Sequence, residues 1–245
     1  MPLTENPRPV RKVFTTRAGG VSAAPYDSFN LGLHVGDDPR SVRANRRRLA
    51  RVVGVPAERF VWMEQLHTNT VTVVSGPAQE PVAATDALVT TTPNLVLAVL
   101  VADCVPVLLS DATAGVVAAV HAGRLGARNG ILARTVEAMR RCGATPGNIH
   151  ALLGPAASGD SYEVPEEMAR DVDKRLPGSY ARTQTGTPGL DLRAGLERQL
   201  REAGVRAVDV DPRDTIADRD FFSHRREGVT GRQAGLVWLS PEETR

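Results

Sequence analysis

Residues 95–122 read LVLAVLVADCVPVLLSDATAGVVAAVHA. The stretch contains three short apolar runs rich in β-branched residues, Leu95 to Val101, Val105 to Leu109 and Val116 to Val120. A fourth run, Ala87 to Val89, precedes them, and polar residues or glycines stand at the borders of all four. Short continuous apolar runs of this kind are typical of strands buried on both faces. The stretch therefore predicts the sheet core of the protein.

The apolar pattern changes to helical spacing on both sides of this core. Asp37-Asp38-Pro39 predicts the start of a helix, whose apolar face continues until Gly54 ends it. Amphipathic helices are also predicted over Ile131 to Met139, Glu166 to Leu176 and Leu192 to Ala203. Helices thus flank the strand-rich centre on the N-terminal and the C-terminal side.

The chain contains no internal repeat, low-complexity tract or linker that would divide it. A chain of 245 residues buries roughly 70% of its surface on folding, which is enough for one substantial core. We therefore predict a mixed α/β (α+β) fold, a single domain with a broad β-sheet core flanked by helices, over residues 13–241. Residues 1–12 are polar and rich in proline, and we expect them to form an N-terminal extension.

Composition excludes several classes of protein. The formal net charge is only +2, and acidic residues stand among the arginines, so no electrostatic stripe for nucleic acid is expected. The longest apolar stretch, Leu95 to Ala102, is less than half of a membrane span of about 20 residues. No apolar signal-like segment opens the sequence. We expect a cytoplasmic monomer or homodimer with no nucleic-acid or membrane partner.

Three side chains that can bind a soft metal stand where predicted strands meet turns: His67, Cys104 and His121. A thiolate and two imidazoles with one open position form a plausible catalytic zinc set. A cysteine in an apolar run is also common as plain core packing. A third hypothesis makes Cys104 a nucleophile and His121 its base, with Asp103 or Gln65 orienting the imidazole.

A series of short segments resembles, in the same order, the YfiH/laccase-domain family of purine nucleoside phosphorylases, formerly described as multicopper polyphenol oxidases. The segments are 15–22 (TTRAGGVS), 29–32 (FNLG), 64–67 (EQLH), 85–87 (TDA), 102–107 (ADCVPV), 120–123 (VHAG), 153–155 (LGP), 221–226 (FFSHRR) and 230–232 (TGR). The match extends from about Val13 to Leu239. It implies a single α/β domain and a zinc ion held by His67, Cys104 and His121, with Cys104 and His121 at the centre of catalysis.

The resemblance also implies the activity and the partners. The family carries out phosphorolysis of adenosine, inosine and methylthioadenosine, and hydrolytic deamination of adenosine, so purine nucleoside and phosphate are the expected partners. Copper is the alternative metal, for a polyphenol oxidase. The chain has only five histidines, dispersed along the sequence, which is too few for a multicopper cluster. A metal-stabilised binding module without catalysis is a further alternative.

Three residues are candidate substrate contacts. Asn30 could bind a ribose hydroxyl, although an asparagine in a turn often bonds its own backbone. Arg46 could meet phosphate, or it could belong to a solvated helix face with Arg47 and Arg48. Arg226 lies in one of the matching segments and is a candidate contact for substrate or phosphate.

The sequence departs from the family pattern close to two of the expected ligands. Many members follow the second histidine with Ala-Gly-Trp-Arg-Gly, whereas this chain has Arg124 and Leu125 in place of the Trp and Arg. Thr68 stands where a glycine is common. These changes leave the ligands intact, but they bear on the preferred substrate. If the arginine that Leu125 replaces binds phosphate or base in relatives, Arg124 must take over that role from the preceding position.

Overall fold

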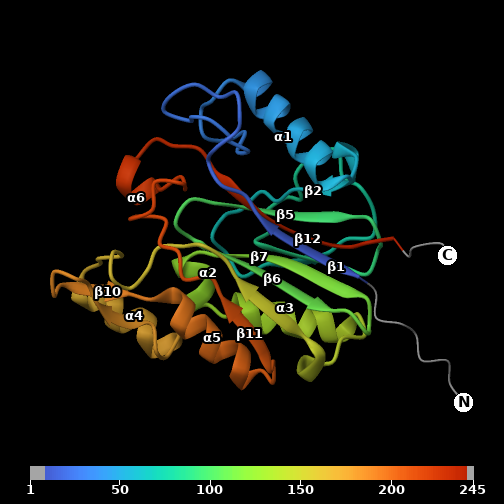
Figure 1. Cartoon of the computed structure of the whole chain (residues 1–245). Coiled ribbons are helices and arrows are strands. Elements are labelled where there is room, and N and C mark those ends of the chain that lie inside the picture. Colours follow the sequence, from blue (N-terminus) through green and yellow to red (C-terminus); the bar gives the residue numbers. More distant parts are fainter. Residues whose placement is uncertain (1–8, 242–245) are drawn as a thin grey trace, which may run out of the picture.

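Two stacked β-sheets form the centre of the computed structural model, which describes residues 9–241 (Figure 1). The larger sheet consists, in spatial order, of β11 (Ala207–Val210), β8 (His150–Leu153), β6 (Val105–Asp111), β7 (Val116–Ala122), β4 (Ala87–Thr90) and β3 (Val71–Val73). The smaller sheet consists of β1 (Val10–Phe14), β12 (Gln233–Leu239), β5 (Val96–Val101) and β2 (Phe60–Val61). A separate hairpin joins β9 (Tyr180–Arg182) and β10 (Pro188–Leu190).

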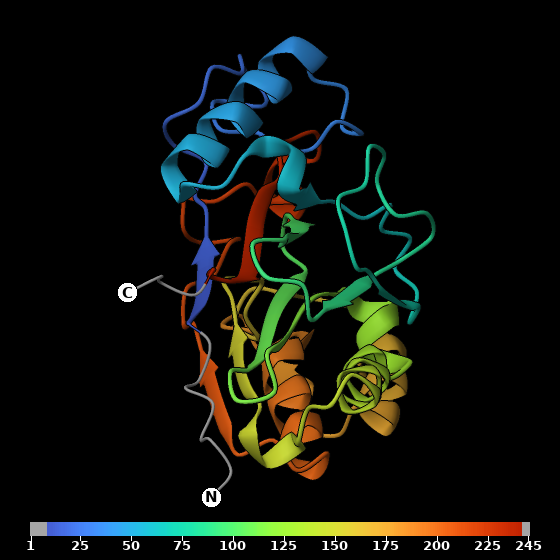
Figure 2. The same ribbon diagram turned by 90° about the vertical axis from the view of Figure 1, so that its right-hand side faces the viewer.

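Helices cover the outer faces of both sheets, so the molecule has four layers (Figures 1 and 2). Helix α1 (Pro39–Val53) packs on the four-stranded sheet, and α3 (Ile131–Arg141) and α5 (Leu192–Glu202) pack on the six-stranded sheet. The remaining helical segments are η1 (Ala57–Arg59), α2 (Arg124–Arg128), η2 (Pro146–Asn148), α4 (Glu166–Arg175) and α6 (His224–Glu227). The mixed α/β class and the flanking helices agree with the prediction, while the broad sheet divides into two.

Strand β5 shows why the central runs are continuously apolar. Val96, Ala98 and Leu100 belong to the apolar cluster beneath α1. Leu97 and Val99 alternate with them and belong to the cluster between the two sheets. Because successive side chains of a strand point to opposite faces, a strand in an inner layer needs apolar residues at every position.

Helix α1 begins and ends where the sequence predicts. The Asp38 carboxylate accepts a hydrogen bond from the backbone N–H of Arg40, and Pro39 occupies the first helical position. Gly54 ends the helix with a φ of +73°, and its N–H donates to the Ala50 carbonyl. An acidic N-cap and a left-handed C-terminal glycine satisfy the free backbone groups at the two ends.

The structure differs from the predictions at the N-terminus and in several short elements. Strand β1 begins at Val10 and pairs with β12, so residues 10–12 lie in a sheet, although they were expected to be part of the extension. Residues 1–8 of that segment are outside the described range. The hairpin of β9 and β10 and the short helices α2 and α6 carry little periodicity and were not predicted.

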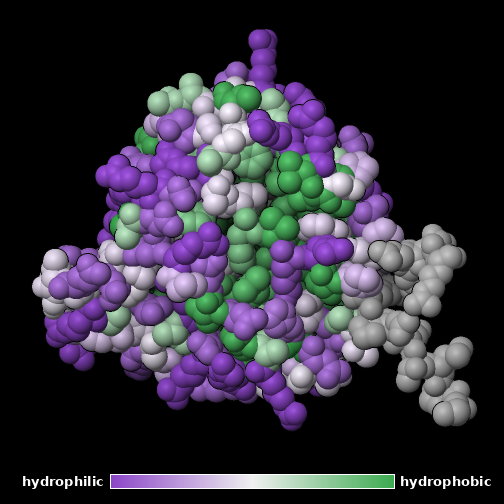
Figure 3. Space-filling view, viewed as in Figure 1, coloured by the Kyte–Doolittle hydropathy of each residue, from purple (hydrophilic) through white to green (hydrophobic). Residues whose placement is uncertain are grey.

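Hydrophobic side chains on the face shown in Figure 3 gather over the middle of the molecule, where the strands lie. The helical layers at the two ends of this view are mostly hydrophilic. Within residues 9–241, none of the helices combines the length and the apolar character required to cross a lipid bilayer.

Candidate metal centre

The three expected ligands converge at one end of the six-stranded sheet. Cys104 immediately precedes β6, and His121 lies near the end of the antiparallel neighbour β7, where Val105 stands opposite Ala122. His67 lies in the loop before β3. The Sγ atom of Cys104 is 3.7 Å from Nε2 of His67, and one ligand atom from each residue lies within 4.8 Å of the others. The predicted cluster is therefore present.

Asp86, which immediately precedes β4, holds two of these ligands in place. Its buried carboxylate accepts a 2.8 Å hydrogen bond from Nδ1 of His121 and a 3.0 Å hydrogen bond from the backbone N–H of His67. The backbone N–H and the hydroxyl of Thr68 each donate to it at 2.7 Å. With its Nδ1 proton donated to Asp86, the His121 ring has its Nε2 lone pair available for a metal.

The partner of His121 differs from the one expected from the sequence. The Gln65 side chain hydrogen-bonds the backbone N–H and carbonyl of Leu100 instead. The Asp103 carboxylate accepts 2.7 Å hydrogen bonds from the Thr215 hydroxyl and the backbone N–H of Arg225. Neither residue orients the imidazole. Asp86 had no role assigned to it, although the matching segment 85–87 contains it.

The electrostatics of the site favour an ionised thiol. Burial alone would raise the pKa of Cys104, but His121 and His67 outweigh it and lower this pKa to about 6. Burial alone would lower the pKa of His121, but Cys104 and Asp86 raise it to about 9. The pKa of Asp86 falls to about 2, because hydrogen bonds from His121 and Thr68 exceed the opposing effect of burial.

The backbone around the ligands is specialised. His67 and Asp103, which is adjacent to Cys104, have φ values of +59° and +85°, in the left-handed region that residues other than glycine seldom adopt. A Cβ atom at Gly123 would lie 2.6 Å from Cδ2 of His67 and 3.3 Å from Sγ of Cys104. Strained positions of this kind cluster at functional sites. Here they occur in the two turns that bring His67 and Cys104 together.

The donor set fits a single transition-metal ion. A thiolate with two imidazoles suits zinc and is also compatible with copper. Two of the expected ligands, His67 and Cys104, line a pocket of about 250 Å³, and the buried His121 lies behind them. The pocket leaves room for a substrate beside these ligands. In the part of the chain that the structure describes, no other group of three or more histidine, cysteine or acidic side chains is arranged to bind a metal.

The structure does not bring Asn30 or Arg46 to this pocket. The Asn30 amide donates to the Gly32 carbonyl and to Asp37, and its oxygen accepts from the backbone N–H groups of Gly32 and Arg232. Its hydrogen-bonding capacity is therefore used within the protein, as for a turn asparagine. Arg46 donates twice to the Leu31 carbonyl, and its guanidinium lies 3.8 Å from the centre of the Trp62 ring.

Arg226 also lies outside the lining of the pocket. Its guanidinium donates to the backbone carbonyls of Thr215, Ile216, Asp218 and Phe221. These contacts hold together the loop that precedes α6, so the side chain supports the segment that carries the neighbouring Arg225.

Other side chains line the pocket beside the ligands, among them Arg124, Leu125, Tyr162 and Arg225. The sequence pointed to Arg124 and Leu125 as departures from the family pattern, and Arg225 lies in a matching segment. Tyr162 has no such signal, because it lies in the loop between β8 and α4 and reaches the pocket only through the tertiary fold. Arg225 covers the face of the Tyr162 ring, with its guanidinium carbon 4.9 Å from the ring centre.

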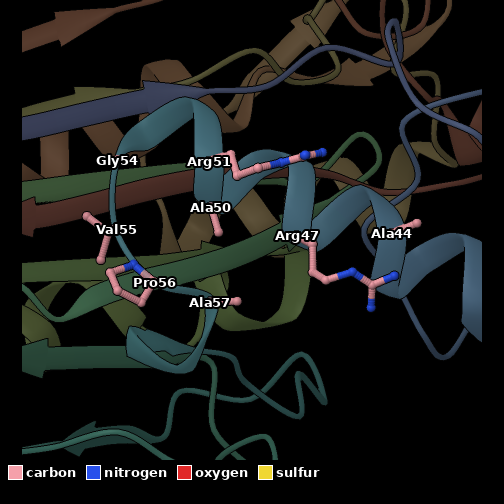
Figure 4. A pocket seen from close by; sticks show the side chains of 8 residues that line it. All are labelled: Ala44, Arg47, Ala50, Arg51, Gly54, Val55, Pro56 and Ala57. Carbon is pink, nitrogen blue, oxygen red and sulfur yellow. The ribbon is translucent and has the colours of Figure 1, made fainter.

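A wider groove of about 600 Å³ lies elsewhere, between α1 and the segment that follows it (Figure 4). It is lined by Ala44, Arg47, Ala50, Arg51, Gly54, Val55, Pro56 and Ala57. The lining contains no nucleophile, no carboxylate and no metal ligand. Of these two pockets, the smaller one at the end of the six-stranded sheet is the one that carries a thiol and an imidazole of the candidate metal site.

Known proteins resemble this chain over almost its whole length. A family model described as "Multi-copper polyphenol oxidoreductase laccase" matches residues 11–240. A purine nucleoside phosphorylase of Corynebacterium glutamicum is 66% identical over 237 residues, covering 96% of each chain. One of Mycobacterium tuberculosis is 58% identical over 230 residues, covering 94% of this chain and 92% of the relative.

A solved structure has the same fold over nearly its whole length. YlmD from Geobacillus stearothermophilus matches with a TM-score of 0.90 and 34% identity, covering 95% of this chain and 92% of the other. The family model, the close relatives and this structural match span the two sheets and the His67, Cys104 and His121 cluster alike. The chain therefore belongs to the YfiH/laccase-domain family.

Proposed function

We propose that this chain is a zinc-dependent purine nucleoside phosphorylase that acts on adenosine, inosine and methylthioadenosine. The observation that carries the proposal is the convergence of His67, Cys104 and His121 beside a pocket, with Asp86 hydrogen-bonded to the ring of His121. The 66% identity to a protein named purine nucleoside phosphorylase supports the same reaction. The proposed partners are therefore a purine nucleoside and phosphate.

In phosphorolysis a phosphate oxygen forms a bond to C1′ of the ribose while the bond between C1′ and the purine nitrogen breaks. The bonding electron pair leaves with the purine, which takes up a proton, and ribose 1-phosphate is the second product. The transition state separates charge, because the ribose becomes positive before the new bond is complete. Fixed charges that hold the phosphate and the leaving base therefore accelerate the reaction.

The residues of this chain prepare the site for that chemistry. Cys104 is held as a thiolate beside the two imidazoles, and Asp86 keeps the proton of His121 on Nδ1. The loop that carries His67 is fixed by backbone hydrogen bonds to the same carboxylate. A zinc ion held by His67, Cys104 and His121 would supply a Lewis-acidic positive charge beside the pocket.

Hydrolytic deamination of adenosine is proposed as a second activity of the same site. This reaction replaces the amino group at the purine C6 position with an oxygen from water and releases ammonia. It needs a nucleophilic water near a metal but no phosphate, so the two activities can be assayed separately.

The direct test is to incubate the purified protein with adenosine, with and without phosphate, and to follow the products by chromatography. We expect equal amounts of adenine and ribose 1-phosphate only when phosphate is present, and inosine as the product of deamination. Cys104→Ser is expected to abolish both activities, whereas Cys142→Ser, at the end of α3, is a matched control that retains them. Absence of phosphate-dependent adenine release from the native protein would contradict the proposal.

One observation supports a second candidate, a hydrolase that uses Cys104 as a nucleophile without a metal. The lowered pKa of Cys104 and the raised pKa of His121 describe a thiolate–imidazolium pair, and Asp86 orients the imidazole. Such a pair can attack an ester or an amide carbonyl. Hydrolysis of an activated ester that persists in a strong chelator, and disappears in Cys104→Ser, would favour this candidate. Loss of all activity with the chelator, restored by zinc, would favour the phosphorylase.

A further inference from the structure

Two guanidinium groups reach the metal pocket from separate segments of the chain. Arg124 opens α2, directly after Gly123, and Arg225 lies in α6, about a hundred positions further along. Both line the same pocket as His67 and Cys104. Within residues 9–241, neither arginine forms an ion pair with a carboxylate. Two positive charges therefore line this cavity without a carboxylate partner.

Asp103 is the acidic residue of the lining, and it does not neutralise them. One of its oxygens accepts from the Thr215 hydroxyl, and the other accepts from the backbone N–H of Arg225 rather than from its guanidinium. The carboxylate thus fixes the backbone of α6 and leaves the Arg225 side chain available.

Arg225 is held in place while most of its donors stay free. One guanidinium nitrogen donates to the Glu163 carbonyl at 2.7 Å, and the group lies over the Tyr162 ring. An arginine has five N–H donors, so several remain for a ligand. The charges of Arg124 and Arg225 both oppose the rise that burial causes in the pKa of Tyr162, so both guanidinium groups lie near this tyrosine.

The other arginines near this end of the molecule are occupied. Arg46 and Arg226 direct their guanidinium groups to backbone carbonyls, as described above. Arg17 pairs with Asp27 and Glu227. Arg232 has its charge near Cys104 and Asp103, but one of its guanidinium nitrogens donates to the Thr230 and Gly231 carbonyls and the side chain does not line the pocket. The arginines of the lining itself are Arg124 and Arg225.

We propose that Arg124 and Arg225 form an oxyanion subsite that binds the inorganic phosphate substrate beside the metal. This inference deepens the proposed phosphorylase function and rests on it. Guanidinium forks bind phosphate through paired, charge-assisted hydrogen bonds, and two forks that line one pocket can pair with several of its oxygens. The subsite lies next to Cys104 and His67, so a phosphate there is within the same 250 Å³ cavity as the metal position.

The test measures KM for phosphate and KM for adenosine separately, in Arg124→Gln and in Arg225→Gln. Loss of one charge-assisted contact is expected to raise KM for phosphate about 10- to 100-fold in each variant. KM for adenosine and the rate of deamination, which uses no phosphate, are expected to change less than about threefold. Arg124→Lys and Arg225→Lys keep the positive charge, so we expect them to recover part of the loss.

Arg128→Gln is the matched control, because Arg128 lies one turn further along α2 and pairs with Asp171 outside the pocket. It removes the same charge and should leave both KM values unchanged. Thermal melting shows whether each variant is folded. If a Gln variant does not fold, KM for phosphate is compared between the native protein and the corresponding Lys variant. An unchanged KM for phosphate in folded Arg124 and Arg225 variants would overturn the subsite. So would an increase confined to KM for adenosine, since the arginines would then contact the base.

Binding of phosphate alone separates this inference from the proposed function. Broadening of the phosphorus NMR signal of inorganic phosphate is expected with the native protein and should be reduced in both Gln variants. A native protein that broadens the signal but releases no adenine would contradict the phosphorylase and retain the subsite. Phosphate-dependent release of adenine by the native protein, with a KM for phosphate that neither substitution changes, would support the phosphorylase and contradict the subsite.

Discussion

At the scale of single residues, Asp86 fixes the geometry of the candidate metal centre. Its carboxylate fixes the ring of His121 and also the backbone of His67 and Thr68. It reaches these groups because it directly precedes β4, whose neighbour β7 carries His121. Thr68 adds a hydroxyl donor to the same carboxylate. One acidic side chain thus aligns two ligands that are 54 positions apart in sequence.

Asp86→Asn tests this role. An amide keeps one acceptor oxygen but presents an NH2 group to the donors of the His67 loop, so some of the hydrogen bonds are lost. We expect zinc affinity, measured by competition with a chelating dye, to fall about 10- to 100-fold. Circular dichroism should show a folded protein. Unchanged zinc affinity in the folded variant would mean that the carboxylate does not position the ligands.

At the scale of elements, the strand ends create the site. The starts of β4 and β6, the end of β7 and the loop before β3 all lie at the same end of the six-stranded sheet. The sequence predicts the strands themselves, because their apolar runs and polar borders are local signals. It does not predict which strands are neighbours, since pairing depends on tertiary packing. For that reason the cluster could be suspected from residue types and family resemblance, while the role of Asp86 could not.

The difference between local signals and tertiary packing also explains which parts of the fold the sequence predicts and which it does not. Asp38, Pro39 and Gly54 are local capping signals, and α1 begins and ends at them. The division of the strands into two sheets has no local signal, because a strand buried between two layers is apolar on both faces in either arrangement. Tyr162 joins the pocket through a loop contact of the same non-local kind.

Gly123→Ala tests the packing where β7 passes into α2. The added Cβ would overlap the His67 ring, which must then leave its position beside Cys104. Because His67 is exposed, the ring can move without unfolding the protein. We expect at least a tenfold loss of zinc affinity and of phosphorolysis, with little change in melting temperature.

Gly76→Ala is the matched control, because no atom would lie within 4 Å of its Cβ. It should leave metal binding and activity as they are. Native affinity for zinc in Gly123→Ala would show that His67 is not held against this glycine.

At the scale of the whole molecule, Lys12 links the two sheets. It lies on β1 of the four-stranded sheet, and its amine donates at 2.8 Å to Nδ1 and to the carbonyl of His150 on β8 of the other sheet. His150 in turn contacts Asp209 on β11. Burial lowers the pKa of Lys12 to about 7, and the attraction of Asp209 opposes this only in part. We therefore expect the charge of this contact between the layers to change near neutral pH.

Lys12→Met tests this dependence through thermal melting between pH 6 and pH 9. Below about pH 7 the amine carries a proton in the folded and the unfolded state, so the cost of burying its charge is fully present. Between about pH 7 and 10.5 the unfolded chain keeps a proton that the folded chain has released, so this cost declines as pH rises. The native protein should therefore gain stability relative to Lys12→Met on going from pH 6 to pH 9.

Lys174→Met, which changes an exposed lysine of α4, is the control and should show no such trend. Melting temperatures of the native protein and of Lys12→Met that stay parallel over the whole range would exclude a buried charge at this position.

The content of metal in the purified protein tests most directly whether one ion joins His67, Cys104 and His121. Elemental mass spectrometry should find about one zinc per chain in the native protein and in Cys142→Ser, and almost none in Cys104→Ser. Treatment with a chelator should remove the metal together with the activity, and added zinc should restore both. A native protein that is active without bound metal, or one that keeps its full metal content after Cys104→Ser, would contradict this account.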